Sequence, residues 1–261
     1  MSTSTGTRTT TARERPLAWA VLVTAVLQVL APVVTAFGPG AAPGDGAGAE
    51  LLITPVGWAF SIWGVIYALA IVQAVAALAG RGVSVSRRFQ VDQVALYLAA
   101  VLWILMAALD SSTLTFLALA LMLAAAVDGV LTLARTGVQP RWFRVLTRAT
   151  FGLFAGWVSA AFFLNLATAL VGWGLVDADQ VGWQLVVLAV ATLTLVGLLL
   201  RTRLPTYAAA GLWALIGIVV TGATEDTTAV VVAGAVAVVV LGAATLVALR
   251  SPGRTATGAL G

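Results

Sequence analysis

Long runs without charge constrain this chain more than any other feature of its sequence. A helix rises about 1.5 Å per residue, so about 20 apolar residues are needed to cross about 30 Å of hydrocarbon. Eight segments approach or exceed that length, and only one of them contains a charge, Asp128. They cover residues 16–44, 51–80, 93–109, 111–134, 149–176, 180–200, 204–224 and 227–249. The sequence therefore predicts an all-α polytopic membrane protein with eight transmembrane helices.

The composition supports this class and excludes several functions. Hydrophobic residues make up 61% of the chain and charged residues 9%, against about a quarter in soluble domains, and the mean hydropathy is +1.05. The chain has no cysteine and no histidine. Disulfides, thiolate metal sites and the commonest general base are thus excluded. We predict no catalytic residue, no metal site, no cofactor and no enzymatic activity.

The basic residues predict the orientation. All 14 are arginines, and under the eight-span model they all lie on one side of the membrane, whereas the opposite connections carry only acidic charges. Cytoplasmic loops retain positive charge, so both termini should be cytoplasmic. Arginine without lysine, amid much Ala, Val and Gly, suggests a bacterial inner membrane. The arginines form no extended basic face, so a nucleic-acid partner is not expected.

The chain divides into four predicted parts. Residues 1–15 and the cytoplasmic tail 251–261 lack apolar residues and should be disordered. Residues 16–174 would form a five-helix ligand-binding bundle, and residues 175–250 three additional helices. A signal peptide is the alternative for residues 1–37, although the apolar segment from Leu17 is longer than a typical signal core, which favours a retained helix. The connection 38–53 is either a flexible lid or a plain tether.

Aromatic residues gather inside the second predicted helix. Phe60, Trp63 and Tyr67 share one face at helical spacing, and Trp58 lies near the outer interface. The polar atoms of Trp63 and Tyr67 need partners that lipid tails cannot supply, so these rings should face protein or a ligand. Trp58 is either an interfacial anchor or a ligand contact.

The fifth predicted helix places aromatic, small and polar residues on one face: Phe154, Trp157, Val158, Ala161, Asn165, Thr168 and Gly172. Such a face suits either a flat ligand or close helix packing, with Asn165 and Thr168 as hydrogen-bonding groups. Trp103 occupies the third helix. We expect Trp63, Trp103 and Trp157 to point at each other across an interior gap.

Two further features leave alternatives open. Asp128 is a proton or ion candidate because carboxylates inside membrane helices are rare, but it could also reach water or an arginine at the helix end. Small residues in the seventh helix, including Ala210, Ala214 and Gly217, permit tight packing against the bundle or against a second chain.

The segments "TPVGWAFSIWGVIY" and "LFAGWVSAAFFLN" resemble the tryptophan-rich sensory protein family, which includes translocator protein, the peripheral benzodiazepine receptor. The matching positions are Pro55, Trp58, Phe60, Trp63, Tyr67, Trp157, Leu164 and Asn165, within residues 17 to about 174. The resemblance implies a five-helix bundle, often dimeric, with a pocket for porphyrins and other flat hydrophobic molecules. Phe60, Trp63, Trp157, Ala161 and Leu164 would line that pocket beneath the 38–53 connection. The family's extracellular Trp-x-x-Leu-x-Lys-Pro loop is missing, so contacts attributed to it are not carried over.

The leading hypothesis is an integral membrane protein that binds a flat hydrophobic ligand, tetrapyrrole-like or similar, for sensing, sequestration or transport. The expected ligand-binding residues are Trp58, Phe60, Trp63, Tyr67, Trp103, Trp157, Ala161, Leu164 and Asn165. The expected partners are this ligand, the lipid bilayer and, in a homodimer, a second copy of the chain. Two alternatives stay open: a secondary transporter of a small solute that uses Asp128 or Asn165, and a structural role in which the tryptophans only pack and anchor.

Overall fold

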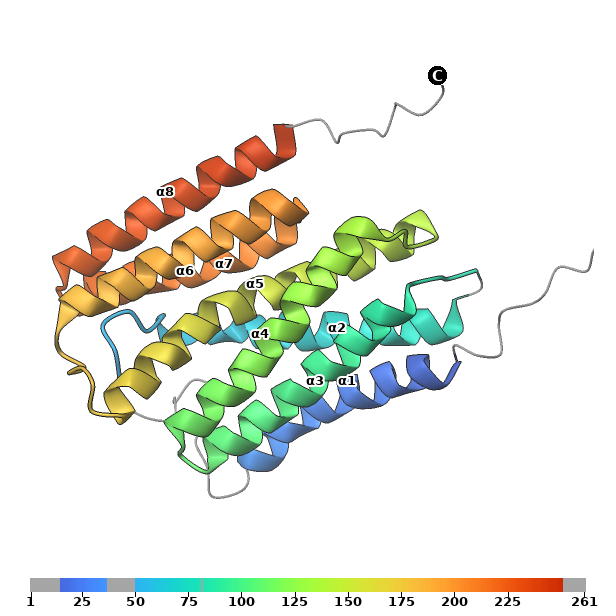
Figure 1. Cartoon of the computed structure of the whole chain (residues 1–261), viewed down its shortest axis with the longest axis horizontal. Coiled ribbons are helices and arrows are strands. Elements are labelled where there is room, and N and C mark those ends of the chain that lie inside the picture. The colour runs from blue at the N-terminus through green and yellow to red at the C-terminus, as the bar shows by residue number, and fades with distance from the viewer. Residues whose placement is uncertain (1–14, 37–49, 81, 251–261) are drawn as a thin grey trace, which may run out of the picture.

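The computed structural model describes residues 15–36, 50–80 and 82–250, and its helices follow the charge-free runs (Figure 1). The described part is helical throughout, without a strand, and contains eight helices long and apolar enough to cross a membrane. The predicted fold class is confirmed. The elements are α1 (Arg15–Ala36), the short 3-10 helix η2 (Gly57–Ser61), α2 (Ile62–Ala79), α3 (Arg87–Ala108), α4 (Ser112–Arg135), α5 (Arg141–Gly172), α6 (Val181–Thr202), α7 (Pro205–Thr224) and α8 (Thr228–Arg250). The segments predicted to be disordered, 1–15 and 251–261, lie outside the described residues except for Arg15, where α1 begins, and most of the 38–53 connection lies outside them too.

The helices alternate in direction, so the start of α1 and the end of α8 lie on the same side of the molecule (Figure 1). The described arginines stand at the starts of α1, α3 and α5, at the ends of α4, α6 and α8, and just after α6. All of these positions belong to that one side. The acidic residues of the opposite connections, among them Asp110, Asp177 and Glu225, lie at the other end. The charge separation expected from the sequence is therefore present in the fold.

Two helices begin earlier than the charge-free runs indicated. α3 begins at Arg87 because the Ser86 side chain caps it, accepting a hydrogen bond from the Phe89 N–H at 3.3 Å. α5 begins at Arg141, directly after Pro140, and continues for 32 residues. A search for charge-free runs finds the apolar centre of a helix and misses a charged first turn. As a consequence, Asp92 lies inside α3 rather than before it.

α5 is the central helix, since it packs against α2, α4, α6 and α7. Two glycines allow α7 to approach it closely. A Cβ atom at Gly152 would collide with Thr206 Oγ1, and one at Gly156 with the backbone oxygen of Tyr207. The Tyr207 hydroxyl donates to Ser159 Oγ at 2.9 Å. The last three helices are thereby attached to the first five through α7.

The segment before α2 docks onto α7. The Val56 N–H donates to the Gly217 carbonyl at 3.2 Å, and Trp213 Nε1 donates to the Ala59 carbonyl at 2.7 Å. A Cβ atom at Gly217 would lie 3.0 Å from the Cβ atoms of Pro55 and Ala59. Gly217 therefore packs against the segment before α2, and Ala210 lies against Gly156 of α5. These two small residues of α7 pack against the bundle, the first of the two predicted alternatives.

Candidate functional site

Four of the predicted aromatic residues, Trp63, Tyr67, Trp103 and Trp157, form one continuous cluster with Phe154. The Trp63 ring stacks on Tyr67 with centroids 5.4 Å apart and on Trp103 at 5.7 Å. It also meets Phe154 and Trp157 edge to face, at 5.7 and 6.2 Å. Trp63 is 5% exposed and Trp157 2%. Offset stacking and edge-to-face contacts are the preferred arrangements of aromatic pairs, so α2, α3 and α5 are joined here by direct ring packing.

The rings do point at one another, but the gap expected between Trp63, Trp103 and Trp157 is filled by their own contacts. The Trp103 N–H needs no ligand between the rings, because the protein itself supplies its hydrogen-bond acceptor. Trp103 Nε1 donates to Asn165 Oδ1 at 3.2 Å, while Asn165 Nδ2 donates to the Ala161 carbonyl at 3.1 Å. Asn165 thus joins α3 to α5, whereas the Thr168 hydroxyl donates within α5, to the Leu164 carbonyl at 3.0 Å.

A cavity lies on the other side of Trp157, between α5, α6 and α7. Its volume is about 40 Å³. The cavity is therefore small, with room for a few water-sized molecules. The lining residues are all apolar: Ile53, Pro55, Phe60, Trp157, Ala160, Ala161, Phe163, Leu164, Val187, Leu188, Ala191, Leu195, Ala214, Leu215 and Ile218.

Four of the predicted ligand-binding residues line this cavity: Phe60, Trp157, Ala161 and Leu164. Phe60 meets Trp157 edge to face with centroids 5.7 Å apart, so the two rings form one wall. The residues from α6 and α7 were not predicted, since the sequence resemblance ends near residue 174. The signal was present in α6, where Leu188, Ala191 and Leu195 recur at helical spacing. Trp63, Tyr67, Trp103 and Asn165 belong to the neighbouring aromatic cluster.

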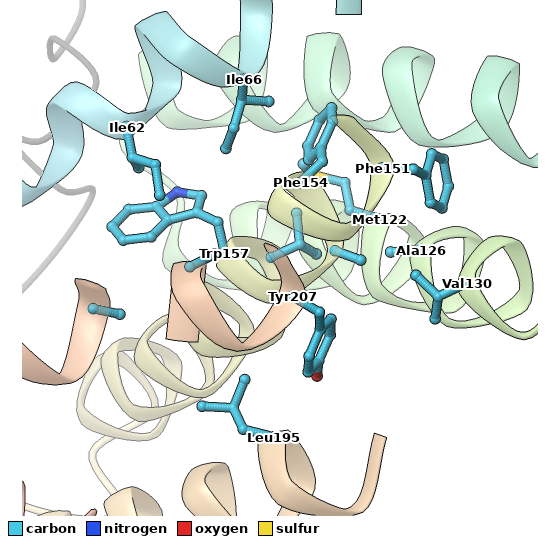
Figure 2. Packing of buried hydrophobic residues seen from close by; sticks show 14 of the residues in the cluster. Ile62, Ile66, Met122, Ala126, Val130, Phe151, Phe154, Trp157, Leu195 and Tyr207 are labelled. Atoms are coloured by element: carbon cyan, nitrogen blue, oxygen red, sulfur yellow. The ribbon is translucent and has the colours of Figure 1, made fainter. Parts of the chain in front are cut away.

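Trp157 also carries a buried polar atom on the edge of its ring. Its indole N–H is buried and has no acceptor in the described structure. Figure 2 shows the indole nitrogen on the edge of the ring that faces Ile62 of α2. A buried donor without a partner is costly in an apolar environment, because neither lipid nor side chain replaces the hydrogen bond to water. This edge of the ring is a place where an acceptor atom would be stabilised.

Trp58 lies away from the cavity. Its ring is 45% exposed and packs edge to face on Trp213 of α7, with centroids 4.8 Å apart. This position, at the helix end opposite the arginines, agrees with the anchor interpretation of Trp58.

Asp128 is held by an arginine of the neighbouring helix. Arg88 donates to both of its carboxylate oxygens, from Nε at 2.9 Å and from Nη2 at 2.6 Å. The Arg88 side chain is 70% exposed and the Asp128 side chain 39%, so the pair lies at the rim of the bundle. This agrees with the alternative prediction that Asp128 reaches water or an arginine at the helix end.

Sequence reasoning missed Asp92, which lies beside this ion pair. Its side chain is 8% exposed, and its Oδ2 has no hydrogen-bond partner in the described structure. A Cβ atom at Gly129, the residue after Asp128, would lie 3.4 Å from the Asp92 Cβ atom, so Asp92 packs against α4 beside Asp128. The cap at Ser86, which starts α3 ahead of Asp92, was the available signal. No group of three or more His, Cys, Asp or Glu side chains in the described ranges could hold a metal ion.

Comparison with known proteins gives one match. A family model described as TSPO-like protein matches residues 14–247. No curated protein and no solved structure matches the chain. The matched region continues past residue 174 and into α8, so it includes the helices that complete the cavity.

Proposed function

The chain belongs to the TSPO-like protein family, and we propose that this membrane protein binds a flat hydrophobic small molecule in the cavity between α5, α6 and α7. Binding would serve sensing, sequestration or transport. The observation that most supports the proposal is an apolar cavity between membrane-spanning helices. Two aromatic rings, Phe60 and Trp157, form one of its walls. Such pockets typically combine apolar walls with few polar groups.

The cavity size limits what can enter without rearrangement. A cavity of about 40 Å³ is smaller than the engineered apolar cavity of about 150 Å³ that accepts benzene, so a planar ring, and still more a whole tetrapyrrole, needs the lining side chains to move apart. The lining residues carry no charge, so an ionised carboxylate inside would be poorly solvated. We therefore propose a ligand with an uncharged planar part that lies against Phe60 and Trp157. No catalytic group is required.

The test begins with the protein as purified in mild detergent, from which mass spectrometry identifies any retained small molecule. Binding is then measured against a tetrapyrrole, a carotenoid and a sterol by changes in their absorbance and in tryptophan fluorescence. Trp157→Ala should weaken binding about thirtyfold, since truncation of a central buried aromatic costs about 2 kcal/mol or more. Trp157→Phe keeps most of the ring contact, so its affinity should lie between those of Trp157→Ala and the unaltered protein.

Trp142→Ala is the control, because this tryptophan is 53% exposed and lies at the opposite end of α5. The proposal fails if no compound of the panel binds and none copurifies. It also fails if Trp157→Ala binds as tightly as the unaltered chain.

One observation favours a second candidate function, a secondary transporter. Asp92 is a buried carboxyl with an unpartnered oxygen beside the Arg88–Asp128 pair, and intramembrane carboxyls commonly mark proton pathways. Asn165 is engaged by Trp103, which favours the carboxyl pair over Asn165 as the coupling site. Proton flux into reconstituted vesicles, followed with a pH-sensitive dye, should be lost in Asp92→Asn and kept in Asp179→Asn. Absence of flux in the unaltered protein would reject this candidate.

We further propose a bacterial inner membrane as the location, with both termini in the cytoplasm, on the basis of the arginine distribution. A homodimer stays a prediction.

A further inference from the structure

A cleft between the ends of α4 and α6 lies on the arginine-bearing side of the molecule, away from the ligand cavity. Its volume is about 500 Å³, and it is lined by Leu131, Ala134 and Arg135 of α4 and by Leu200, Arg201 and Arg203 at the end of α6. Figure 1 shows that α4 and α6 both end on this side. The cleft therefore combines guanidinium groups from two helices with aliphatic walls.

The cleft continues along α4 as an apolar hollow. A second space, of about 490 Å³, is lined by Ala120, Leu123, Ala124, Val127, Asp128 and Leu131 of α4 and by Phe162 of α5. Leu131 borders both spaces. From residue 120 to residue 135 a helix rises about 22 Å, which exceeds the half-thickness of about 15 Å of a hydrocarbon core. The combined groove therefore spans about one membrane leaflet.

The charges along the groove are placed at one end. Three arginines line the cleft, and the one acidic residue of the groove, Asp128, is bound by Arg88 through both carboxylate oxygens. α4 and α6 both end here, and helix C-termini repel anions, so any attraction for an anion must come from the guanidinium groups. Arginine suits phosphate because its planar group donates two parallel hydrogen bonds.

We propose that this groove binds one anionic phospholipid, with its phosphate at Arg135 and Arg201 and an acyl chain along Ala124, Val127 and Leu131. Basic pockets between transmembrane helices on the cytoplasmic side are suited to anionic headgroups. The apolar continuation favours a lipid over free phosphate, because a free anion gains nothing from that surface. The inference is independent of the ligand cavity and of the proposed function.

The test uses the full chain in nanodiscs of phosphatidylcholine with a minor share of phosphatidylglycerol. Native mass spectrometry counts the lipids that the released protein retains. The unaltered protein should keep one phosphatidylglycerol in preference to phosphatidylcholine. The double variant Arg135→Gln/Arg201→Gln should retain it about twenty-fivefold less, at roughly fivefold per arginine near a membrane surface.

Two further variants distinguish the contribution of the lipid headgroup from that of its acyl chain. Arg141→Gln/Arg144→Gln removes two arginines of the same side that do not line the groove, and it should retain the lipid normally. Ala124→Phe fills the apolar hollow, and it should reduce retention while all arginines remain. Inorganic phosphate, added as a competitor at millimolar concentration, should displace little of the lipid.

Three results would overturn the proposal: equal retention of the two lipids by the unaltered protein, preference for phosphatidylglycerol that survives Arg135→Gln/Arg201→Gln, or an equal loss in the Arg141→Gln/Arg144→Gln control. Efficient displacement by inorganic phosphate, or full retention by Ala124→Phe, would reduce the site to a simple anion site and reject the lipid.

Discussion

Trp103 and Asn165 show how single side chains hold this bundle together inside the membrane. The Trp103 N–H donates to Asn165 Oδ1, and Asn165 returns its own N–H to its helix at Ala161. No water is available in hydrocarbon to replace either bond. The pair therefore fixes the distance between α3 and α5 next to the Trp63 ring, and it explains why an amide stands on this face of α5.

Replacement of Trp103 by phenylalanine should lower the free energy of unfolding modestly. Interhelical hydrogen bonds in membranes are worth about 0.6 kcal/mol on average and up to about 1.7 kcal/mol, and phenylalanine keeps most of the stacking on Trp63. Unfolding by denaturant in bicelles measures this loss. A double-mutant cycle with Asn165→Leu is the control, because the second substitution should cost less once Trp103 is gone. Strictly additive costs would mean that the bond contributes nothing.

At the scale of elements, the contact of α5 with α7 holds the last three helices against the first five. Gly156 faces the backbone of Tyr207 with no room for a methyl group, and Gly152 faces Thr206 in the same way. Small residues at such positions let helix backbones approach, which is how helices associate where lipid removes the hydrophobic driving force. The α5–α6–α7 cavity exists because α7 is held in this position while α6 meets α5 less closely.

Gly156→Ala should lower the melting temperature of the protein and loosen the cavity wall. Overpacking of this kind costs about 1–3 kcal/mol, because the clash is with backbone and cannot be relieved by a rotamer change. Gly197→Ala on α6 is the matched control, since a Cβ atom there meets no other atom within 4 Å. Alanine is also the better helix former, so the control should be neutral or slightly stabilising. Equal melting temperatures for the two variants would contradict the close-contact interpretation.

The whole molecule is polarised by charge. Arginines occupy one end of the bundle and acidic connections the other, so the fold has one basic and one acidic membrane surface. The groove between α4 and α6 opens on the basic surface, whereas the segment that closes the ligand cavity, Ile53 to Pro55, lies toward the acidic one. The two proposed binding sites are thus directed to opposite leaflets.

The absence of native cysteines makes this polarity testable with single-cysteine variants. Asp179→Cys, in an exposed acidic connection, should react with a membrane-impermeant maleimide in intact cells. Gly137→Cys, in an exposed connection on the arginine side, should react only after the membrane is opened. Labelling in the reverse order would show that the termini are not cytoplasmic, and labelling of both in intact cells would exclude a simple spanning orientation.

The sequence alone determined the number of helices, their approximate limits and the side on which the arginines lie. These properties are local: a run of apolar residues must be helical in a bilayer whatever its neighbours, because its backbone groups have no other partners. The helix ends depended on caps such as Ser86. Because the charge-free run placed the start of α3 after Asp92, the sequence pattern did not identify Asp92 as a residue inside a helix. Of the five residues that the family resemblance assigned to a pocket, Phe60, Trp157, Ala161 and Leu164 line one cavity, whereas Trp63 lies in the aromatic cluster.

Only the tertiary structure decided which rings touch and where space remains. Trp63, Trp103 and Trp157 lie on three helices, and whether they enclose a gap or fill it depends on how closely those helices approach, which single-helix patterns do not encode. The walls from α6 and α7 depend on the Gly156–Tyr207 contact between segments far apart in the chain. Packing distance between helices is a property of both surfaces at once, and for that reason the cavity could be located only after the chain was folded.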